Sequence, residues 1–274
     1  MKKGRILIFI LLCVLAVIFI APVFIILMNS FKTKFSISQT PFMLFDKTTF
    51  VGLENYTTGL ANTGFITAFF MSLFITVFAV FAIVLFTSMT AWYIVREKTK
   101  FTKFLYTLFV FSMIVPFQMV MFTMSKTANI LRLDNPIGIV FIYLGFGAGL
   151  AVFIFSGFVK SIPFGIEEAA TIDGCTPPQT FFKIVFPMMK PTLITVAILN
   201  TMWIWNDYLL PALVIGSDYK TIPIAIQYLK GGYGSIDMGG LMAMLVLAVL
   251  PVIIFYLFCQ KYIIKGVAAG ALKG

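Results

Sequence analysis

Residues 6–28 read ILIFILLCVLAVIFIAPVFIILM, a run that contains no charged side chain. A helix needs about 20 apolar residues to cross the hydrocarbon core of a bilayer, so this run is long enough to span it. A membrane barrel strand would alternate polar and apolar residues, whereas this run is apolar on every side. A secretory signal peptide would have a shorter apolar core and a cleavage site of small residues. The run therefore predicts a retained membrane-spanning helix.

The rest of the chain has the same character. Hydrophobic residues make up 61% of the sequence and charged residues 11%, and the mean hydropathy is +1.04, which is too apolar for a soluble domain. The fourth apolar segment carries Gly145, Gly147 and Gly149, small residues that predict close packing between helices. We expect an all-α membrane protein with one transmembrane domain over residues 1–274. Its six spans are expected at about 6–28, 65–95, 104–124 (interrupted by Pro116), 137–159, 192–215 and 241–258.

The basic residues indicate the side of the membrane that each segment occupies. Thirteen of the 20 Lys and Arg fall in segments on the side of the N-terminus, and seven fall on the other side. Cytoplasmic segments carry an excess of Lys and Arg, so both termini, the loop 160–191 and the tail 260–274 are predicted to be cytoplasmic. The basic residues lie at segment ends rather than in one patch, which argues against a nucleic-acid partner. We expect a multi-pass protein of the cell (inner or plasma) membrane, surrounded by the lipid bilayer.

Residue types needed for most catalytic and metal chemistry are missing. The chain contains no His, and its three cysteines, Cys13, Cys175 and Cys259, are scattered. They indicate neither a disulfide framework nor a metal cluster. No nucleophile is clustered with an acid–base pair. We expect no catalytic residue, no metal site and no cofactor bound by this chain.

One internal stretch mixes acidic, small, Gly and Pro residues: Glu167–Pro187, EEAATIDGCTPPQTFFKIVFP. Before it, Pro163 suits a first helical turn, and Gly174 lies where a left-handed C-terminal cap is expected. Thr176 and Gln179 have the spacing of a capping box, and Pro187 is expected to stop the second helix. The stretch predicts two short helices joined by a glycine turn.

Two uses of this loop are open on local chemistry alone, because it could lie on the membrane surface or dock to a partner protein. Interfacial helices favour Lys and Arg on their polar face. The first helix instead offers Glu167, Glu168 and Asp173. An acidic face of this kind favours a basic cleft on a partner protein.

The spacing within the loop also resembles a known pattern. Glu168-Ala169-Ala170, followed by Gly174, Ile184 and Pro187, is similar to the EAA motif, E-A-A-x3-G-x9-I-x-L-P, of the membrane subunits of ATP-binding-cassette (ABC) importers; Phe186 stands in place of Leu. The resemblance implies that Glu168 pairs with a basic residue of an ATPase, that the two alanines permit close approach and that Gly174 sets the turn. The ATPase-coupling residues are then Glu167, Glu168, Ala169, Ala170, Asp173, Gly174, Ile184 and Pro187.

Three further segments narrow the resemblance. Residues 260–274, QKYIIKGVAAGALKG, and residues 205–211, WNDYLLP, resemble the corresponding segments of MalG-type permeases of carbohydrate importers, as does Gly52-Leu53-Glu54-Asn55-Tyr56. The resemblance implies a type I ABC importer permease fold, a MalF-type partner permease, two copies of an ABC ATPase that hold ATP and Mg, an extracellular solute-binding protein and a carbohydrate substrate. It also implies that the tail, with Lys273 and Gly274, contacts the ATPases.

Polar residues within the spans are candidates for the solute path, because leaving them in lipid is costly. They are Gln118, Asn200, Trp203, Asn206 and Asp207. The alternative is structural: Asn206 and Asp207 could satisfy backbone groups at a helix break before Pro211, or hold the partner subunit. In the outer segment before the sixth span, Gly232, Tyr233 and Gly234 are candidates for contact with the binding protein, or else form a plain connection.

The leading functional hypothesis is a permease subunit of an ATP-driven, binding-protein-dependent importer of oligosaccharides or related sugars. An ABC permease for a non-sugar solute is one alternative. An ion-coupled secondary carrier is another, but only one acidic residue, Asp207, lies within a span, and the inverted repeats of many carriers are not apparent. A membrane-embedded enzyme would need the clustered catalytic groups that the sequence lacks.

Overall fold

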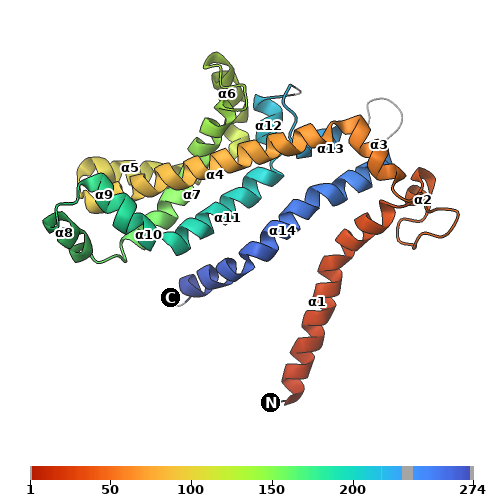
Figure 1. Ribbon diagram of the computed structural model, residues 1–274, viewed down its shortest axis with the longest axis horizontal. Helices are drawn as coiled ribbons and strands as arrows, with labels where there is room; N and C mark the ends of the chain where they lie inside the picture. Colours follow the sequence, from red (N-terminus) through yellow and green to blue (C-terminus); the bar gives the residue numbers. More distant parts are fainter. Residues whose placement is uncertain (1, 217, 230–236, 272–274) are drawn as a thin grey trace. The chain divides into compact units, whose positions relative to one another are not determined.

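A computed structural model of the chain describes residues 2–216, 218–229 and 237–271 (Figure 1). The described residues form helices and turns, with one isolated bridge between Lys32 and Phe50, which confirms the predicted all-α class. The helices are α1 (Lys2–Asn29), α2 (Lys34–Gln39), α3 (Glu54–Thr63), α4 (Phe65–Arg96), α5 (Lys100–Ser112), α6 (Phe117–Ile130), α7 (Gly138–Val159), α8 (Phe164–Ile172), α9 (Pro177–Thr180), η1 (Phe181–Val185), α10 (Phe186–Met188), α11 (Lys190–Asn206), α12 (Leu209–Val214), α13 (Ile222–Tyr228) and α14 (Met238–Ala271).

Four of these helices contain segments that are long and apolar enough to cross a membrane. They are the segments Gly4–Asn29, Phe65–Arg96, Gly138–Val159 and Met238–Tyr262. Two bent pairs add up to two more crossings, Lys100–Ser112 with Phe117–Ile130 and Pro177–Met188 with Lys190–Asn206. The described helices therefore supply four to six crossings.

The third predicted span, 104–124, is interrupted before Pro116, as expected, and its two parts are the separate helices α5 and α6. α5 and α6 meet at an angle of 107°. Pro116 has no N–H for a helical hydrogen bond, and it disfavours helical geometry at the residue before it. α5 therefore stops at Ser112 and α6 starts after Pro116, which has an extended backbone (φ −62°, ψ 136°).

The fifth span and the tail also differ from the expected boundaries. The fifth span was expected to run to residue 215, but α11 ends at Asn206 and α12 begins at Leu209. The tail 260–274 was expected to follow the sixth span as a separate segment, whereas α14 continues to Ala271. The alanines of this tail favour continuation of a helix.

Contacts divide the chain into two compact units, Met1–Phe69 with Ile222–Ile254, and Phe70–Thr221 with Phe255–Gly274. In the first unit, the segment after α1 folds around Phe31. Its ring lies 5.5 Å from that of Tyr56 and 6.2 Å from those of Phe45 and Phe50. Lys32 is buried and its Nζ donates to the Thr40 carbonyl at 2.8 Å; burial lowers the pKa of this amine.

Asn55 holds this outer segment together. Its Nδ2 donates to the carbonyls of Ser30 (2.8 Å) and Lys32 (2.9 Å). The hydroxyl of Tyr56 lies 2.7 Å from Ser30 Oγ. A Cβ added at Gly239, at the start of α14, would collide with the Asn55 amide. The Asn-Tyr pair of the segment 52–56 is therefore a structural clamp within the first unit.

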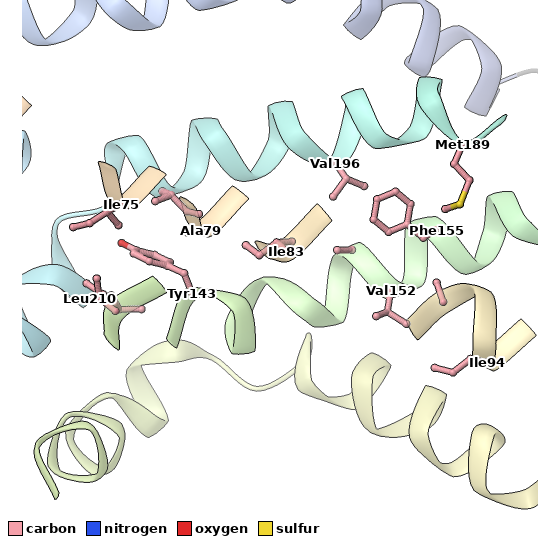
Figure 2. Packing of buried hydrophobic residues seen from close by; sticks show 14 of the residues in the cluster. Ile75, Ala79, Ile83, Ile94, Tyr143, Val152, Phe155, Met189, Val196 and Leu210 are labelled. Atoms are coloured by element: carbon pink, nitrogen blue, oxygen red, sulfur yellow. The ribbon is translucent and has the colours of Figure 1, made fainter. Parts of the chain in front are cut away.

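The core of the second unit is built around α7. Figure 2 shows Tyr143 of α7 between Ile75 of α4 and Leu210 of α12, and Phe155 of α7 beside Val196 of α11. Tyr143, Val152 and Phe155 are all fully buried. A Cβ on Gly147 would lie 2.6 Å from Cδ1 of Ile83 in α4, and one on Gly149 would lie 2.6 Å from Oγ of Ser112 in α5. The expected close packing is confirmed at these two glycines, whereas nothing lies within 4 Å of a Cβ on Gly145.

The clamp of the first unit yields a first prediction. Asn55→Ala should lower the free energy of unfolding by about 1–3 kcal/mol, because the carbonyls of Ser30 and Lys32 lose their side-chain donor. The matched control is Asn62→Ala, at an exposed position of the same helix, which should change it by no more than about 0.5 kcal/mol. Thermal unfolding of the purified protein in detergent measures both. Equal stability of the two variants would contradict the clamp.

Candidate functional site

The loop between α7 and α11 begins with the helix α8. Pro163 precedes it in an extended conformation (φ −58°, ψ 129°), and Asp173 follows it. Gly174 then adopts φ +82°. Its N–H donates to the Thr171 carbonyl (3.0 Å), and that of Cys175 donates to the Ala170 carbonyl (2.9 Å). These two bonds form a Schellman motif, so the predicted glycine cap is confirmed.

The second helix begins as expected but does not end as expected. Gln179 Oε1 accepts from the Thr176 N–H at 2.8 Å, as the capping-box spacing predicts. The prediction that Pro187 stops the helix is wrong, because Pro187 lies inside α10. A π-helical turn, η1, precedes it, and the Phe186 N–H bonds the Phe181 carbonyl. The wider turn accommodates a residue without an N–H.

The chain bends after α10 instead. The axes of the two helices on either side of Met189 differ by 76°. Pro191 cannot donate to the Pro187 carbonyl, which ends the helical ladder at this point. Of the two motif residues at this end of the loop, Ile184 is half-buried and Pro187 is exposed.

The two glutamates of α8 differ in exposure. Glu168 is exposed, as are Ala169 and Asp173, whereas Glu167 is 5% exposed and Ala170 is also buried. The predicted acidic outer face is therefore made by Glu168 and Asp173 without Glu167. Ile172, 85% exposed, lies with them. Of the two alanines, only Ala169 is open to a partner.

Glu167 is bound by residues at the C-terminal end of α4. Arg96, the last residue of α4, places Nη2 2.6 Å from Glu167 Oε1, and its Nε donates to the same oxygen at 2.8 Å. Trp92 Nε1 donates to Oε2 at 2.9 Å. Arg96 Nη2 also donates to the Ile162 carbonyl at 3.1 Å. Both carboxylate oxygens therefore have donors, and we call Trp92, Arg96 and Glu167 the α4–α8 link.

Aromatic contacts surround this link. The Arg96 guanidinium lies 5.6 Å from the centre of the Phe164 ring, at the start of α8. The rings of Trp92 and Phe181 are 5.4 Å apart. Beside the link is a cavity of about 820 Å³, lined by Trp92, Tyr93, Arg96, Glu97, Phe164, Glu167, Glu168, Thr171, Ile172, Cys175, Pro177 and Thr180. α8 is thus held to α4 through a few specific contacts rather than by continuous packing.

Sequence reasoning assigned no role in the site to Trp92 or Arg96. Arg96 was used only as a positive charge that indicates topology. A signal was present, because residues four apart lie on the same helix face, and Trp92 and Arg96 together offer several N–H donors at the end of a span. No local pattern, however, relates them to Glu167, which lies 71 residues after Arg96.

The polar residues of the membrane helices are only partly brought together. Asn200 is buried, and its Nδ2 donates to the Val196 carbonyl of its own helix at 2.8 Å. Asn206 and Trp203 are exposed, with Asn206 Nδ2 donating to the Met202 carbonyl at 2.7 Å. Gln118, on α6, is also exposed.

Asp207 has three internal partners. The Tyr143 hydroxyl of α7 donates to Oδ2 at 3.1 Å, while the N–H groups of Leu209 and Leu210 donate to Oδ1 at 3.0 and 3.4 Å. The last two are unpaired donors at the start of α12, which a carboxylate can satisfy. Tyr143 also packs edge-on against Trp203, with ring centres 5.5 Å apart. This geometry favours the structural role of Asp207.

Some predicted site residues lie outside the described residues. These are Gly232, Tyr233 and Gly234 before the sixth span, and Lys273 and Gly274 at the end of the tail. Within the described residues, no three His, Cys, Asp or Glu side chains are grouped as metal ligands.

Comparison with known proteins places this geometry in context. The family model described as "Binding-protein-dependent transport system inner membrane component" matches residues 83–269. The chain is 41% identical to the "Probable starch degradation products transport system permease protein AmyC" of Thermoanaerobacterium thermosulfurigenes, over 95% of this chain and 94% of that one. It is 33% identical to the "Multiple sugar-binding transport system permease protein MsmG" of Streptococcus mutans, over 97% and 96%.

A solved structure has the same fold. It belongs to a bacterial ABC transporter involved in the import of the acidic polysaccharide alginate, and it superposes with a TM-score of 0.80. The match covers 95% of this chain and 96% of that one, at 22% sequence identity.

The contacts of Asp207 lead to a prediction. Asp207→Asn keeps an oxygen for the N–H groups of α12 and should leave the free energy of unfolding close to that of the wild type. Asp207→Ala removes every acceptor and should lower it by about 1–3 kcal/mol. Asn206→Ala is the matched control, since its side chain bonds only within its own helix. Thermal unfolding in detergent distinguishes them; a fully stable Asp207→Ala protein would contradict the structural role.

Proposed function

Because the chain belongs to the family of binding-protein-dependent transport system inner membrane components, we propose that it is one of two permease subunits of an ATP-driven importer of oligosaccharides or related sugars. It forms half of the translocation pathway and is itself not catalytic. A second permease of MalF type, two ABC ATPase copies and an extracellular solute-binding protein complete the complex. The observation that carries the proposal is α8, a capped helix that turns Glu168 and Asp173 outward on the side predicted to be cytoplasmic.

The ATPase docks on the outer face of α8. That face combines two carboxylates, Glu168 and Asp173, with the apolar side chain of Ile172 and the small side chain of Ala169. A basic cleft with an apolar floor complements it, because opposite charges orient an encounter while the buried apolar side chain contributes to affinity. ATP and Mg²⁺ are held by the ATPase subunits, and this chain contributes the surface that their conformational cycle displaces.

The sugar class rests on the relatives. AmyC is named for starch degradation products and MsmG for multiple sugars, and the AraQ protein of Bacillus subtilis, 31% identical over 95% of this chain, is named for arabinooligosaccharides. The exposed ring of Trp203 and the exposed amides of Asn206 and Gln118 suit a solute with both apolar ring faces and hydroxyl groups. We propose these three side chains as the contribution of this chain to the solute path.

The partner permease covers apolar surface that this chain leaves open. In α1, no residue of the most apolar stretch of 18 residues is buried. In α4, the large side chains of Phe70, Phe78 and Phe81 are exposed. Lipid covers part of this surface, and the second permease covers the part that encloses the solute.

Transport by the reconstituted complex tests the proposal. The chain is co-expressed with the partner permease, ATPase and binding protein encoded with it, and the complex is placed in proteoliposomes. Uptake of labelled maltooligosaccharides should require internal ATP and the binding protein and should be insensitive to a protonophore. Uptake that follows an ion gradient without ATP would refute the ABC mechanism, and ATP-driven uptake of only a non-sugar solute would refute the sugar assignment.

Docking through Glu168 is tested by reversing its charge. Glu168→Lys should reduce the amount of ATPase that copurifies with the chain by about tenfold or more, since like charges that meet at an interface cost several kcal/mol. Glu54→Lys, the same change in α3 on the side predicted to be extracellular, is the matched control and should leave copurification unchanged. Equal recovery of ATPase from both variants would place docking elsewhere.

The cap of α8 gives a further prediction. Gly174→Ala places a side chain at φ +82°, which costs roughly 1–2 kcal/mol for an L-residue, and should reduce both ATPase copurification and transport. Gly165→Ala, within α8, meets only Glu168 Oε2 at 3.9 Å and serves as the control that should retain both. Unchanged transport in Gly174→Ala would show that the turn tolerates another backbone conformation.

A further inference from the structure

The α4–α8 link joins the helix that we propose as the docking element to a helix that crosses the membrane. We propose that Glu167 is a positioning residue: through Arg96 and Trp92 it makes α8 and α4 move together, so that a displacement of α8 by the ATPase reaches the membrane core. The inference rests on the proposed docking role of α8. It gives Glu167 a different role from its neighbour Glu168, although both belong to the stretch predicted to contact the ATPase.

The geometry of the link favours rigid coupling over loose attachment. Two N–H groups donate to the carboxylate, Arg96 Nε to Oε1 and Trp92 Nε1 to Oε2, and Arg96 Nη2 forms an ion pair with Oε1. Charge-assisted bonds of this kind are short and directional. The Arg96 and Glu167 side chains are only 15% and 6% exposed, so water competes little for their partners.

The link holds α8 at more than one point. Arg96 bonds Glu167 in the middle of α8, lies over the ring of Phe164 at its start and bonds the Ile162 carbonyl before it. Contacts at successive points along α8 resist rotation as well as translation of that helix. Trp92 also contacts Phe181, in the second helical segment of the loop, so the link holds that segment to α4 as well.

From Arg96 the coupling continues along α4. This helix has 32 residues and is therefore about 48 Å long. Its inward face is buried at Ile75, Ala79, Ile83 and Ala91 (Figure 2 shows the first three), which are at most 2% exposed. Close-packed interiors transmit displacement rather than absorb it. A shift of α8 thus changes the position of α4 against α7, at the contact between Ile83 and Gly147.

The matched experiment compares variants of two carboxylates and one tryptophan in the intact complex. Glu167→Gln keeps the size of the side chain but removes the charge that binds Arg96. We expect it to retain ATPase copurification and basal ATP hydrolysis, while the solute transported per ATP hydrolysed falls about tenfold, the effect of losing a charge-assisted bond. Glu97→Gln, at an exposed carboxylate next to Arg96, should retain the wild-type ratio. Trp92→Phe, which removes one donor and keeps the ring, should lower the ratio by less than Glu167→Gln.

Outcomes for Glu167 and Glu168 separate the two proposals. Loss of copurifying ATPase in Glu167→Gln as large as in Glu168→Lys would make Glu167 a docking residue and overturn the link, while leaving the docking proposal intact. An unchanged transport ratio in Glu167→Gln would overturn the link as well. If Glu168→Lys leaves docking unaffected, the docking proposal fails instead, whatever Glu167→Gln does.

A distance measurement tests the link without relying on transport or ATP hydrolysis as the readout. Spin labels are attached at Gly165→Cys on α8 and Glu97→Cys at the end of α4, after the three native cysteines are replaced by Ser. With the link present, the distance between the labels should be the same in the resting and ATP-bound complexes, and Glu167→Gln should broaden it. A distance that changes on ATP binding in the otherwise unaltered complex would show that α8 moves independently of α4, and would refute the proposal.

Discussion

In the hydrocarbon core of a bilayer, a backbone N–H or C=O has no water to bond, so each interruption of a helix needs its own substitute. This constraint explains the positions of the breaks in the chain. Outside the core, in the loop predicted to be cytoplasmic, Pro187 also interrupts the hydrogen bonds, and there the substitute is a π-helical turn in which the Phe186 N–H donates to the Phe181 carbonyl. Before α12 it is the carboxylate of Asp207, which accepts from Leu209 and Leu210. The unusual features of the fold are therefore the places where the regular ladder of hydrogen bonds fails.

The same constraint decides what the sequence could predict. α1, α4, α7 and α14 are unbroken helices, and apolar length alone identifies them. The cap at Gly174 was also predictable, because it depends on residues within one turn. The π-turn before Pro187 and the 107° bend between α5 and α6 were not. A proline indicates where the backbone hydrogen bonds of a helix are interrupted. The angle between the two halves, however, depends on the neighbouring helices against which they pack, and no local residue determines this angle.

For the candidate site, the limit of sequence reasoning is clearest at Glu167 and Glu168. Successive residues of a helix point about 100° apart, so two adjacent glutamates cannot both lie at the centre of one face. The family pattern singles out Glu168, yet the composition of α8 does not say which glutamate turns inward. The answer comes from Arg96 and Trp92, which lie one helical turn apart at the end of α4. A buried carboxylate requires such partners, and they are too far away in sequence to be inferred.

Charge in the membrane is governed by the same requirement for partners. Asp207 was the natural candidate for a solute or ion site, because an acidic group within a span is costly unless it is used. Its two oxygens instead bond Tyr143 and the start of α12. A solute hydroxyl would have to compete with these internal donors and would leave buried N–H groups unpaired. The groups that can contact a solute at no such cost are those already exposed, Trp203, Asn206 and Gln118. The solute contacts that we propose for this chain are therefore an aromatic ring and neutral amides, which suit passage rather than tight binding.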